Sequence, residues 1–121
     1  MSKIVLVIED DVTIGCLLTQ VIRNNLKLGC IQISDAESAF ELLACESSKK
    51  NIALIVSDII LPGMTGLQMA AEVESRGLNI PILLISSNIK PDGDIAFLQK
   101  PFTIKDFISK AEALLVTRTD T

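Results

Sequence analysis

The chain of 121 residues contains no histidine. This absence excludes the Ser/His and Cys/His pairs of nucleophilic catalysis, so any histidine chemistry must come from a partner. Basic clusters are also missing, because none exceeds Lys49-Lys50 and the net charge is −4. Binding to the backbone of duplex nucleic acid needs neutralising lysine and arginine, and we therefore expect no direct nucleic-acid partner.

Long hydrophobic runs are absent as well. No run approaches the ~18 apolar residues of a membrane-spanning helix. The first residues, Met1-Ser2-Lys3, lead directly into an expected strand without a signal-peptide pattern. We therefore expect a soluble, cytoplasmic protein with no membrane partner.

Cysteine is scarce. The three cysteines, Cys16, Cys30 and Cys45, are widely spaced and odd in number. This arrangement fits neither a disulfide framework nor a metal site. We interpret them as small buried apolar side chains in a reduced compartment.

The chain is rich in short apolar runs. Hydrophobic residues make up 49% of it and the mean hydropathy is +0.47. Runs of this kind are typical of strands that are covered on both faces. Strand-like and helix-like patterns alternate, which predicts an α/β fold with helices on both faces of a parallel sheet. At this length we expect a single domain, residues 1–121.

Apolar periodicity and capping residues predict the individual elements. Strands are expected at 3–8, 30–33, 52–57, 80–85 and 95–98, helices at about 12–25 and 66–75 and from residues 36 and 104 onward, and polar segments at 47–51 and 117–121. Asp11, Thr65 and Thr103 are expected to cap helices, and Ser34 to form a capping box with Glu37. The helix positions predicted to face the core are Ile14, Leu17, Leu18, Val21, Ile22, Ala36, Ala39, Phe40, Leu43, Ala44, Ile104, Phe107, Ile108, Ala111, Leu114 and Leu115.

One connection breaks the alternation. Residues 86–94 join the last two expected strands, and Pro91 and Gly93 interrupt them. A parallel crossover normally takes a dozen or more residues and a helix. We therefore expect the helix of this crossover to be missing or reduced to a turn.

Acidic residues follow two of the apolar runs. Glu9-Asp10-Asp11 comes after residues 4–8, and Asp58 follows residues 52–57 and precedes a Pro/Gly turn. If the two strands are neighbours, these carboxylates converge at the edge where open α/β sheets place their chemistry. Like charges so close need a counter-ion, and for oxygen ligands the simplest is a hard divalent cation such as Mg²⁺.

Four separated signals together resemble the receiver domain of two-component response regulators over essentially the whole chain. They are Glu9-Asp10-Asp11, Asp58 with Pro62 and Gly66, Ser86 after the fourth strand, and Lys100-Pro101-Phe102 after the fifth. The resemblance implies a flavodoxin-like, doubly wound sheet of five parallel strands in the order 2-1-3-4-5. The fourth crossover helix, which usually belongs to the family's output face, is the one expected to be missing, so the usual dimer mode is not assumed.

The resemblance also implies residue roles. Asp58 would be the phosphoacceptor, and Lys100 the cation on the phosphoryl oxygens. Ser86 would be the switch hydroxyl, with Phe97 changing rotamer beside it. The implied ligands of Mg²⁺ are Glu9, Asp10, Asp58 and the backbone carbonyl of Ile60, and the implied cis peptide is Lys100-Pro101.

The implied function is that of a signalling switch. The domain would take a phosphoryl group from the phosphohistidine of a histidine kinase or histidine phosphotransfer protein, and would signal to a downstream protein by contact. It would be no enzyme beyond its own phosphorylation and dephosphorylation. One alternative is a pseudo-receiver that binds partners without phosphate. Another is a Mg²⁺-dependent phosphatase with an aspartyl nucleophile, although Ile60 stands where such enzymes usually place a second aspartate.

Simpler interpretations of the single residues also exist. Asp58 could be a turn or cap residue and Ser86 a turn hydroxyl. Lys100 could be a solvated surface lysine, and Phe97 an ordinary core aromatic. The spatial arrangement of these side chains decides between the two sets of interpretations.

Overall fold

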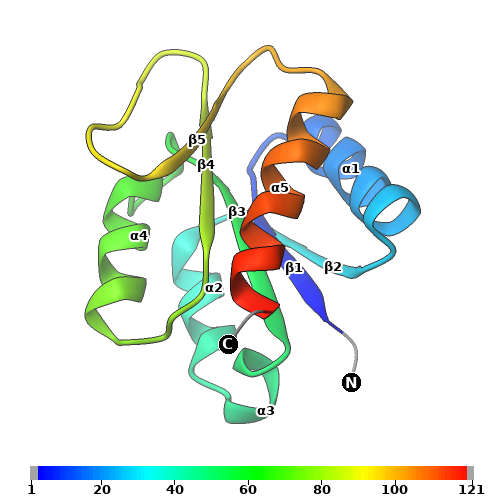
Figure 1. The fold of residues 1–121 in the computed structure, drawn as a ribbon. Coiled ribbons are helices and arrows are strands. Elements are labelled where there is room, and N and C mark those ends of the chain that lie inside the picture. The colour runs from blue at the N-terminus through cyan, green and yellow to red at the C-terminus, as the bar shows by residue number, and fades with distance from the viewer. Residues whose placement is uncertain (1–2, 120–121) are drawn as a thin grey trace.

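The computed structural model describes residues 3–119, in which five parallel strands form one sheet (Figure 1). The strands are β1 (Ile4–Ile8), β2 (Gly29–Ile33), β3 (Ile52–Asp58), β4 (Ile82–Ser86) and β5 (Ala96–Gln99). They pair in the order β2-β1-β3-β4-β5, and each neighbouring pair is parallel. The doubly wound sheet and its strand order, both predicted from the sequence, are confirmed.

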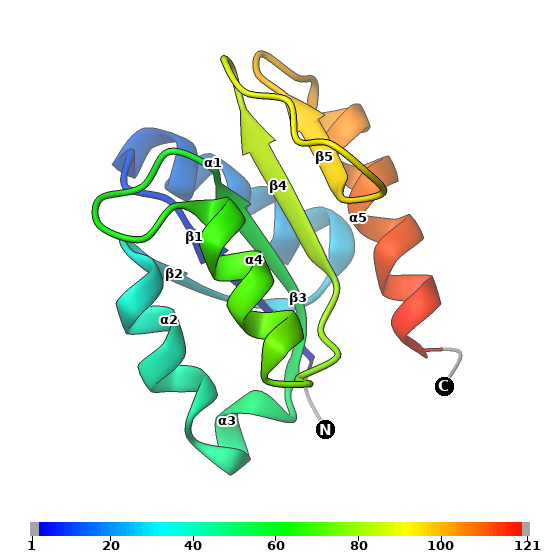
Figure 2. The ribbon, with the colours of Figure 1, turned by 90° about the vertical axis from the view of Figure 1, so that its left-hand side faces the viewer.

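Helices cover both faces of the sheet (Figures 1 and 2). They are α1 (Val12–Val21), the π-helix η1 (Ile22–Leu26), α2 (Ala36–Leu43), α3 (Glu46–Lys49), α4 (Gly66–Ser75) and α5 (Ile104–Thr119). Side chains of α1 and α5 pack on one face, and those of α2 and α4 pack on the other. None of the helices within residues 3–119 is long and apolar enough to cross a membrane.

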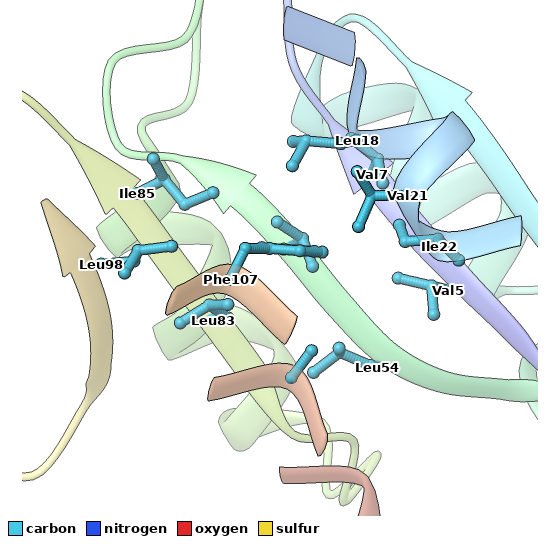
Figure 3. Close-up of a cluster of buried hydrophobic side chains, with 12 residues drawn as sticks. Val5, Val7, Leu18, Val21, Ile22, Leu54, Leu83, Ile85, Leu98 and Phe107 are labelled. Atoms are coloured by element: carbon cyan, nitrogen blue, oxygen red, sulfur yellow. The ribbon is translucent and has the colours of Figure 1, made fainter. Parts of the chain in front are cut away.

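One of the two hydrophobic cores lies between the sheet and the pair α1 and α5 (Figure 3). Leu18 of α1, Ile22 of η1 and Phe107 of α5 point into it. They meet a floor of strand residues that alternate along the sheet, including Val5 and Leu83. A second core forms on the opposite face, where α2 and α4 contribute Ala36, Ala39, Phe40, Leu43, Met69 and Val73.

Three positions expected in the core are exposed. Leu17, Ala44 and Ile104 all face solvent. Leu17 lies one residue beside the narrow stripe that α1 presents to the sheet. Ala44 is the residue after the end of α2, and Ile104 lies in the first turn of α5. Periodicity assigns a face to each helix but does not show where the helix ends relative to the sheet.

Helix boundaries also differ from the sequence prediction. The predicted helix 12–25 divides into α1 and η1, and η1 ends where Lys27 adopts a left-handed conformation with φ 59°. Within the segment 47–51, predicted to be a polar turn, the short helix α3 extends to Lys49. The predicted polar segment 117–121 is helical as far as Thr119, and its last two residues lie outside the described part.

The capping predictions are confirmed with one correction. Asp11 accepts hydrogen bonds from the amides of the α1 first turn, and Thr65 forms a full capping box with Gln68. Thr103 accepts the Asp106 amide at 3.0 Å. Ser34 does not cap α2. Asp35 directly precedes the helix and its Oδ1 accepts the Ser38 amide at 2.7 Å, which lowers the pKa of Asp35.

The cysteine prediction is wrong in its burial. Cys16 and Cys45 are exposed and Cys30 is half-buried, and all three are free thiols. Hydrogen bonds from Ser47 and Ser48 lower the pKa of Cys45 to about 7, while burial raises the pKa of Cys30. Spacing excluded a disulfide framework correctly, but it does not determine burial.

The missing crossover helix is confirmed. Residues 87–95, all of which the structure describes, contain no helix. They run as an irregular loop from the carboxyl end of β4 to the start of β5 (Figure 2). The helix-free loop leaves part of the α4 side of the sheet without a covering helix, which is where parallel sheets usually carry one.

Candidate functional site

The site is built at the carboxyl edge of the sheet, where β1, β3 and β5 end. Glu9 follows β1, Asp58 is the last residue of β3, and Lys100 follows β5. Backbone hydrogen bonds extend the pairing past the strand ends, from Glu9 to Ile33 and from Lys100 to Ser86. Backbone hydrogen bonds therefore fix the positions of the Glu9 and Lys100 main chains, from which their side chains extend.

Lys100 joins the carboxylates of two separate strands. Its Nζ donates to Asp58 Oδ2 at 2.9 Å and lies 3.4 Å from Glu9 Oε1. The side chain of Asp58 is 11% exposed and that of Glu9 is 2% exposed. This contact excludes the interpretation of Lys100 as a solvated surface lysine.

Backbone amides hold the carboxylates in place. Glu9 Oε2 accepts the Asp11 amide at 3.1 Å, and Asp58 Oδ1 accepts the Ile60 amide at 3.2 Å. Each carboxylate therefore has one oxygen on a backbone amide and the other near Lys100. Groups held in this way need little rearrangement to meet an incoming charged ligand.

The electrostatics follow from this crowding. Burial raises the pKa of Glu9, and the nearby charge of Asp58 adds to the rise, although the Asp11 amide opposes it. Burial lowers the pKa of Lys100, but Asp58 and Glu9 outweigh this effect, so the pKa lies above its ordinary value. Glu9, Asp10 and Asp58 bring three acidic side chains together beside a single lysine, and a divalent cation would neutralise the excess of negative charge.

The donor set fits a hard cation. Glu9, Asp10 and Asp58 each offer a carboxylate oxygen, and these oxygens lie within 4.8 Å of one another. Asp10 is exposed, so the cluster opens to solvent on its side. Carboxylate oxygens are the ligands that Mg²⁺ prefers. The structure brings together three of the four predicted metal ligands, and the fourth, the Ile60 carbonyl, stays a prediction.

Ser86 and Phe97 lie on the neighbouring strands. Ser86 is buried at the end of β4, and its Oγ accepts the amides of Asn88 and Ile89 at 3.3 and 3.2 Å. Its hydroxyl therefore fixes the first turn of the helix-free loop. Phe97 pairs with Leu84, while Ser86 pairs with Gln99, so Phe97 lies two residues further back on the same face of the sheet. Its predicted rotamer change is not tested by this arrangement.

The turn after Asp58 depends on Gly66. The Gly66 amide donates to the Ile59 carbonyl at 2.8 Å, which folds the start of α4 back on the end of β3. A Cβ at this position would press on the Asp58 carbonyl oxygen and on Ile59 Cα. In the sequence Gly66 stands out only as part of a motif, and the close backbone approach explains why a glycine is needed there.

Three exposed apolar residues at this edge escaped the sequence analysis as a group. Val12 is 71% exposed, Ile60 is 53% exposed and Ile104 is 47% exposed. Each belongs to a segment that leaves the carboxyl edge of the sheet, after Asp11, Asp58 and Thr103 respectively. The available signal was their position, since Val12 and Ile104 directly follow capping residues and Ile60 lies two residues after Asp58. Helical periodicity instead placed Ile104 in the core.

The cis peptide at Lys100-Pro101, predicted from the resemblance, is present. The bond follows Lys100 directly, at the point where the chain leaves β5 toward α5.

Comparisons with known proteins agree on one family. The family model described as the response regulator receiver domain matches residues 5–118. The chain is 30% identical over 118 residues to an uncharacterized transcriptional regulatory protein, YbdJ, of Bacillus subtilis, with 92% of this chain and 50% of that protein covered. It is 22% identical to the response regulator RppA of Synechocystis, with 91% and 49% covered.

Solved structures show the same fold. The signal receiver domain of a LuxO repressor protein from Vibrio parahaemolyticus superposes with a TM-score of 0.85 at 16% identity, over 98% of this chain and 94% of that one. The receiver domain of an HD domain-containing protein from Pseudomonas fluorescens gives 0.84 at 20% identity, with both chains fully covered.

The chain spans about half the length of the curated relatives described above. The match therefore does not extend to the functions of the remaining halves of those proteins. The family match covers nearly every residue, and the strand order and the acidic edge described above agree with it. The chain belongs to the response regulator receiver domain family of two-component systems.

Proposed function

We propose that this domain is a phosphoacceptor switch in which Asp58 receives a phosphoryl group from a partner's phosphohistidine. The partner would be a histidine kinase or a histidine phosphotransfer protein, since the chain has no histidine of its own. The observation that carries the proposal is the Asp58 carboxylate, held by Lys100 at 2.9 Å beside two further acids. The proposal assigns residues 1–121 to one receiver domain.

The proposed transfer requires positioning and charge neutralisation. An Asp58 oxygen attacks phosphorus and forms the new P–O bond, while the bond between phosphorus and the imidazole nitrogen of the partner breaks. Lys100 Nζ, already within 2.9 Å of Asp58, would move with the charge from the carboxylate to the phosphoryl oxygens. The Ile60 amide keeps the carboxylate oriented during the attack.

Glu9, Asp10 and Asp58, together with the Ile60 carbonyl, are the proposed ligands of Mg²⁺. When bound, the cation supplies neutralisation of the oxygen charges that build up on transfer. Glu9 contributes its charge from a buried position, and Asp10 contributes from the exposed side of the cluster.

Ser86 is the proposed link from the phosphoryl group to the surface. Its hydroxyl accepts the Asn88 and Ile89 amides in the present structure. A hydroxyl can also donate, and a phosphoryl group on Asp58 would be a strong acceptor for it. Reorientation of Ser86 would alter the hydrogen bonds that hold the 87–95 loop, which is the differential contact a switch needs. Phe97 would follow this change.

The exposed apolar residues at the same edge suggest how the phosphodonor docks. Val12, Ile60 and Ile104 lie on segments that emerge from the edge that carries Asp58. Exposed apolar side chains at the edge that carries a charged site can contribute to an interaction surface. We propose that the helices of a phosphohistidine protein contact them.

Intact-mass spectrometry tests the proposal. The protein is incubated with acetyl phosphate in Mg²⁺ or in EDTA, alongside Asp58→Asn and the matched control Asp92→Asn in the exposed loop. We expect one phosphoryl group to be added in Mg²⁺, in the parent and in the control but not in Asp58→Asn. If no phosphoryl group is added under any condition, the pseudo-receiver alternative is favoured instead.

A further inference from the structure

A groove lies where the missing crossover helix leaves the sheet uncovered. It has a volume of about 840 Å³ and runs from α4 past the start of β4 to the edge strand β5 and the end of α5. Its walls include Ala70 and Ala71 of α4, Ile82 of β4, Ala96 of β5 and Leu114 of α5. Figure 2 shows the three elements that line most of it, with β4 between α4 and the edge strand β5.

The shape and the apolar lining of the groove are suited to binding a helix. Small side chains on α4 face branched and apolar ones from the strands, and Ile95 of the adjoining loop adds an exposed apolar side chain. Faces of parallel sheets are normally covered by helices, and here the chain between β4 and β5 supplies none within residues 87–95. Apolar surface that water reaches favours burial against another element.

The charged residues along the groove have one sign. Among the described residues that line it, the ionisable ones are Glu74 on α4 and Asp94 in the loop, and both are acids. They stand on the two sides of the apolar floor. A ligand that fills the floor and carries positive charge along its flanks would meet both acids, and one with acidic flanks would be repelled.

The same charges argue against a second copy of the chain. A two-fold dimer through the groove would place each copy's groove against that of its partner. Glu74 and Asp94 of the two copies would then approach one another as like charges, with no lysine or arginine among the described lining residues to compensate them. A partner of opposite charge is therefore the better occupant.

We propose that this groove is a docking site for an amphipathic helix of a partner protein, whose lysine or arginine flanks pair with Glu74 and Asp94. The apolar face of that helix takes the place of the helix that the fold lacks between β4 and β5. The inference goes beyond phosphoryl transfer at Asp58, and it does not depend on that transfer.

The test is an NMR titration of the ¹⁵N-labelled protein with two synthetic peptides. Each has about 14 residues, is locked as a helix by a hydrocarbon staple, and carries leucine and alanine on one face. One peptide has lysine flanks and the other has glutamate flanks. We expect the lysine peptide to shift the amide signals of Ala70, Ala71, Ile82 and Ala96, and the glutamate peptide to bind at least about tenfold more weakly.

Two charge-reversed proteins make the result specific. Glu74→Lys/Asp94→Lys should bind the lysine peptide about tenfold or more weakly than the parent does, and it should bind the glutamate peptide more tightly than the parent does. The matched control Glu41→Lys/Glu46→Lys changes net charge equally at exposed positions of α2 and α3, and it should bind as the parent does.

Three results would overturn the proposal. The first is the absence of shifts in the groove with the lysine peptide at millimolar concentration. The second is equal binding of that peptide by the parent and by Glu74→Lys/Asp94→Lys. The third is a concentration-dependent shift of the groove signals without any peptide, accompanied by dimer formation in sedimentation, because the groove would then belong to a second copy.

Discussion

Two crossovers leave the acidic edge of the sheet, and they differ sharply. The connection from β3 to β4 turns tightly at Gly66 and continues into the capped helix α4, which packs on the sheet through Met69 and Val73. The connection from β4 to β5 has no helix in residues 87–95 and is tied at its start by the Ser86 hydroxyl. One segment is held by a helix that packs on the sheet, and the other is held by a few hydrogen bonds.

The comparison shows what the site requires. Lys100 reaches Asp58 and Glu9 although no helix precedes β5, because β5 still pairs with β4 and the Lys100 amide still donates to Ser86. The positions of the site residues depend on strand pairing. Covering helices stabilise the sheet, but one of them can be lost without separating the charged groups.

The largest expected effect contrasts the two crossovers in stability. Met69→Ala removes a fully buried side chain of α4, and we expect it to lower the free energy of unfolding by about 2–5 kcal/mol. Ile95→Ala in the helix-free crossover removes an exposed side chain and should cost at most about 0.5 kcal/mol. Urea unfolding followed by circular dichroism measures both. Equal losses would contradict the distinction.

A second prediction concerns the glycines of the two crossovers. Gly66→Ala places a methyl group against the Asp58 and Ile59 backbone, and we expect a loss of about 1–3 kcal/mol together with slower phosphorylation of Asp58. Gly93→Ala meets open space and is opposed only by its φ of +83°, at a cost of about 1 kcal/mol. Urea unfolding and the intact-mass assay compare the two variants. Unchanged phosphorylation in Gly66→Ala would show that the turn does not position the acceptor.

A third prediction tests the hydrogen bonds that hold the helix-free loop. Ser86→Ala removes the acceptor of the Asn88 and Ile89 amides, at a local cost of about 1 kcal/mol, so these amides should exchange about fivefold faster. Ser86→Thr keeps the hydroxyl and serves as the control. Amides of residues 66–75 should not change in either variant. Hydrogen exchange by NMR gives the rates, and exchange in Ser86→Ala at the parental rate would exclude this role.

The same measurement addresses switching. A beryllofluoride adduct on Asp58 imitates the phosphoryl group, and we expect it to change exchange in residues 87–95 more than in residues 66–75. If the adduct leaves the amide exchange rates of residues 87–95 unchanged, Ser86 does not link the site to that loop.

The smallest effect is a pH dependence at the edge that both crossovers share. Burial, supported by the charge of Asp58, raises the pKa of Glu9 above its ordinary value of 4.5. The stability that the protonated group contributes is therefore complete below 4.5 and is lost as pH rises through the folded-state pKa. Glu9→Gln has no such loss. In EDTA, the stability of this variant relative to the parent should increase from pH 4 to pH 7.

Urea unfolding at the two pH values measures this difference. A difference that stays constant would mean that burial of Glu9 has no net effect on its protonation. Added Mg²⁺ should stabilise the parent more than Glu9→Gln at pH 7, because a ligand bound only by the folded state shifts unfolding by mass action.

Much of this protein was determined by local sequence. The apolar runs define the strands, and strands alternating with helices require a parallel sheet. Asp58 and Glu9 come directly after such runs, so their place at the carboxyl edge follows once the strands pair. The loss of the crossover helix was also readable, because nine residues interrupted by Pro91 and Gly93 cannot accommodate it.

Tertiary structure alone decided the contacts between distant segments. Lys100 and Asp58 are 42 positions apart in the sequence, and their hydrogen bond depends on how β5 pairs with β4. No local sequence pattern predicts a contact over such a separation. The exposure of Ile104, the orientation of the Ser86 hydroxyl toward its loop, and the groove beside α4 likewise depend on where each element ends against its neighbours. Periodicity and capping are properties of adjacent residues, whereas burial and proximity arise only when the whole sheet has assembled.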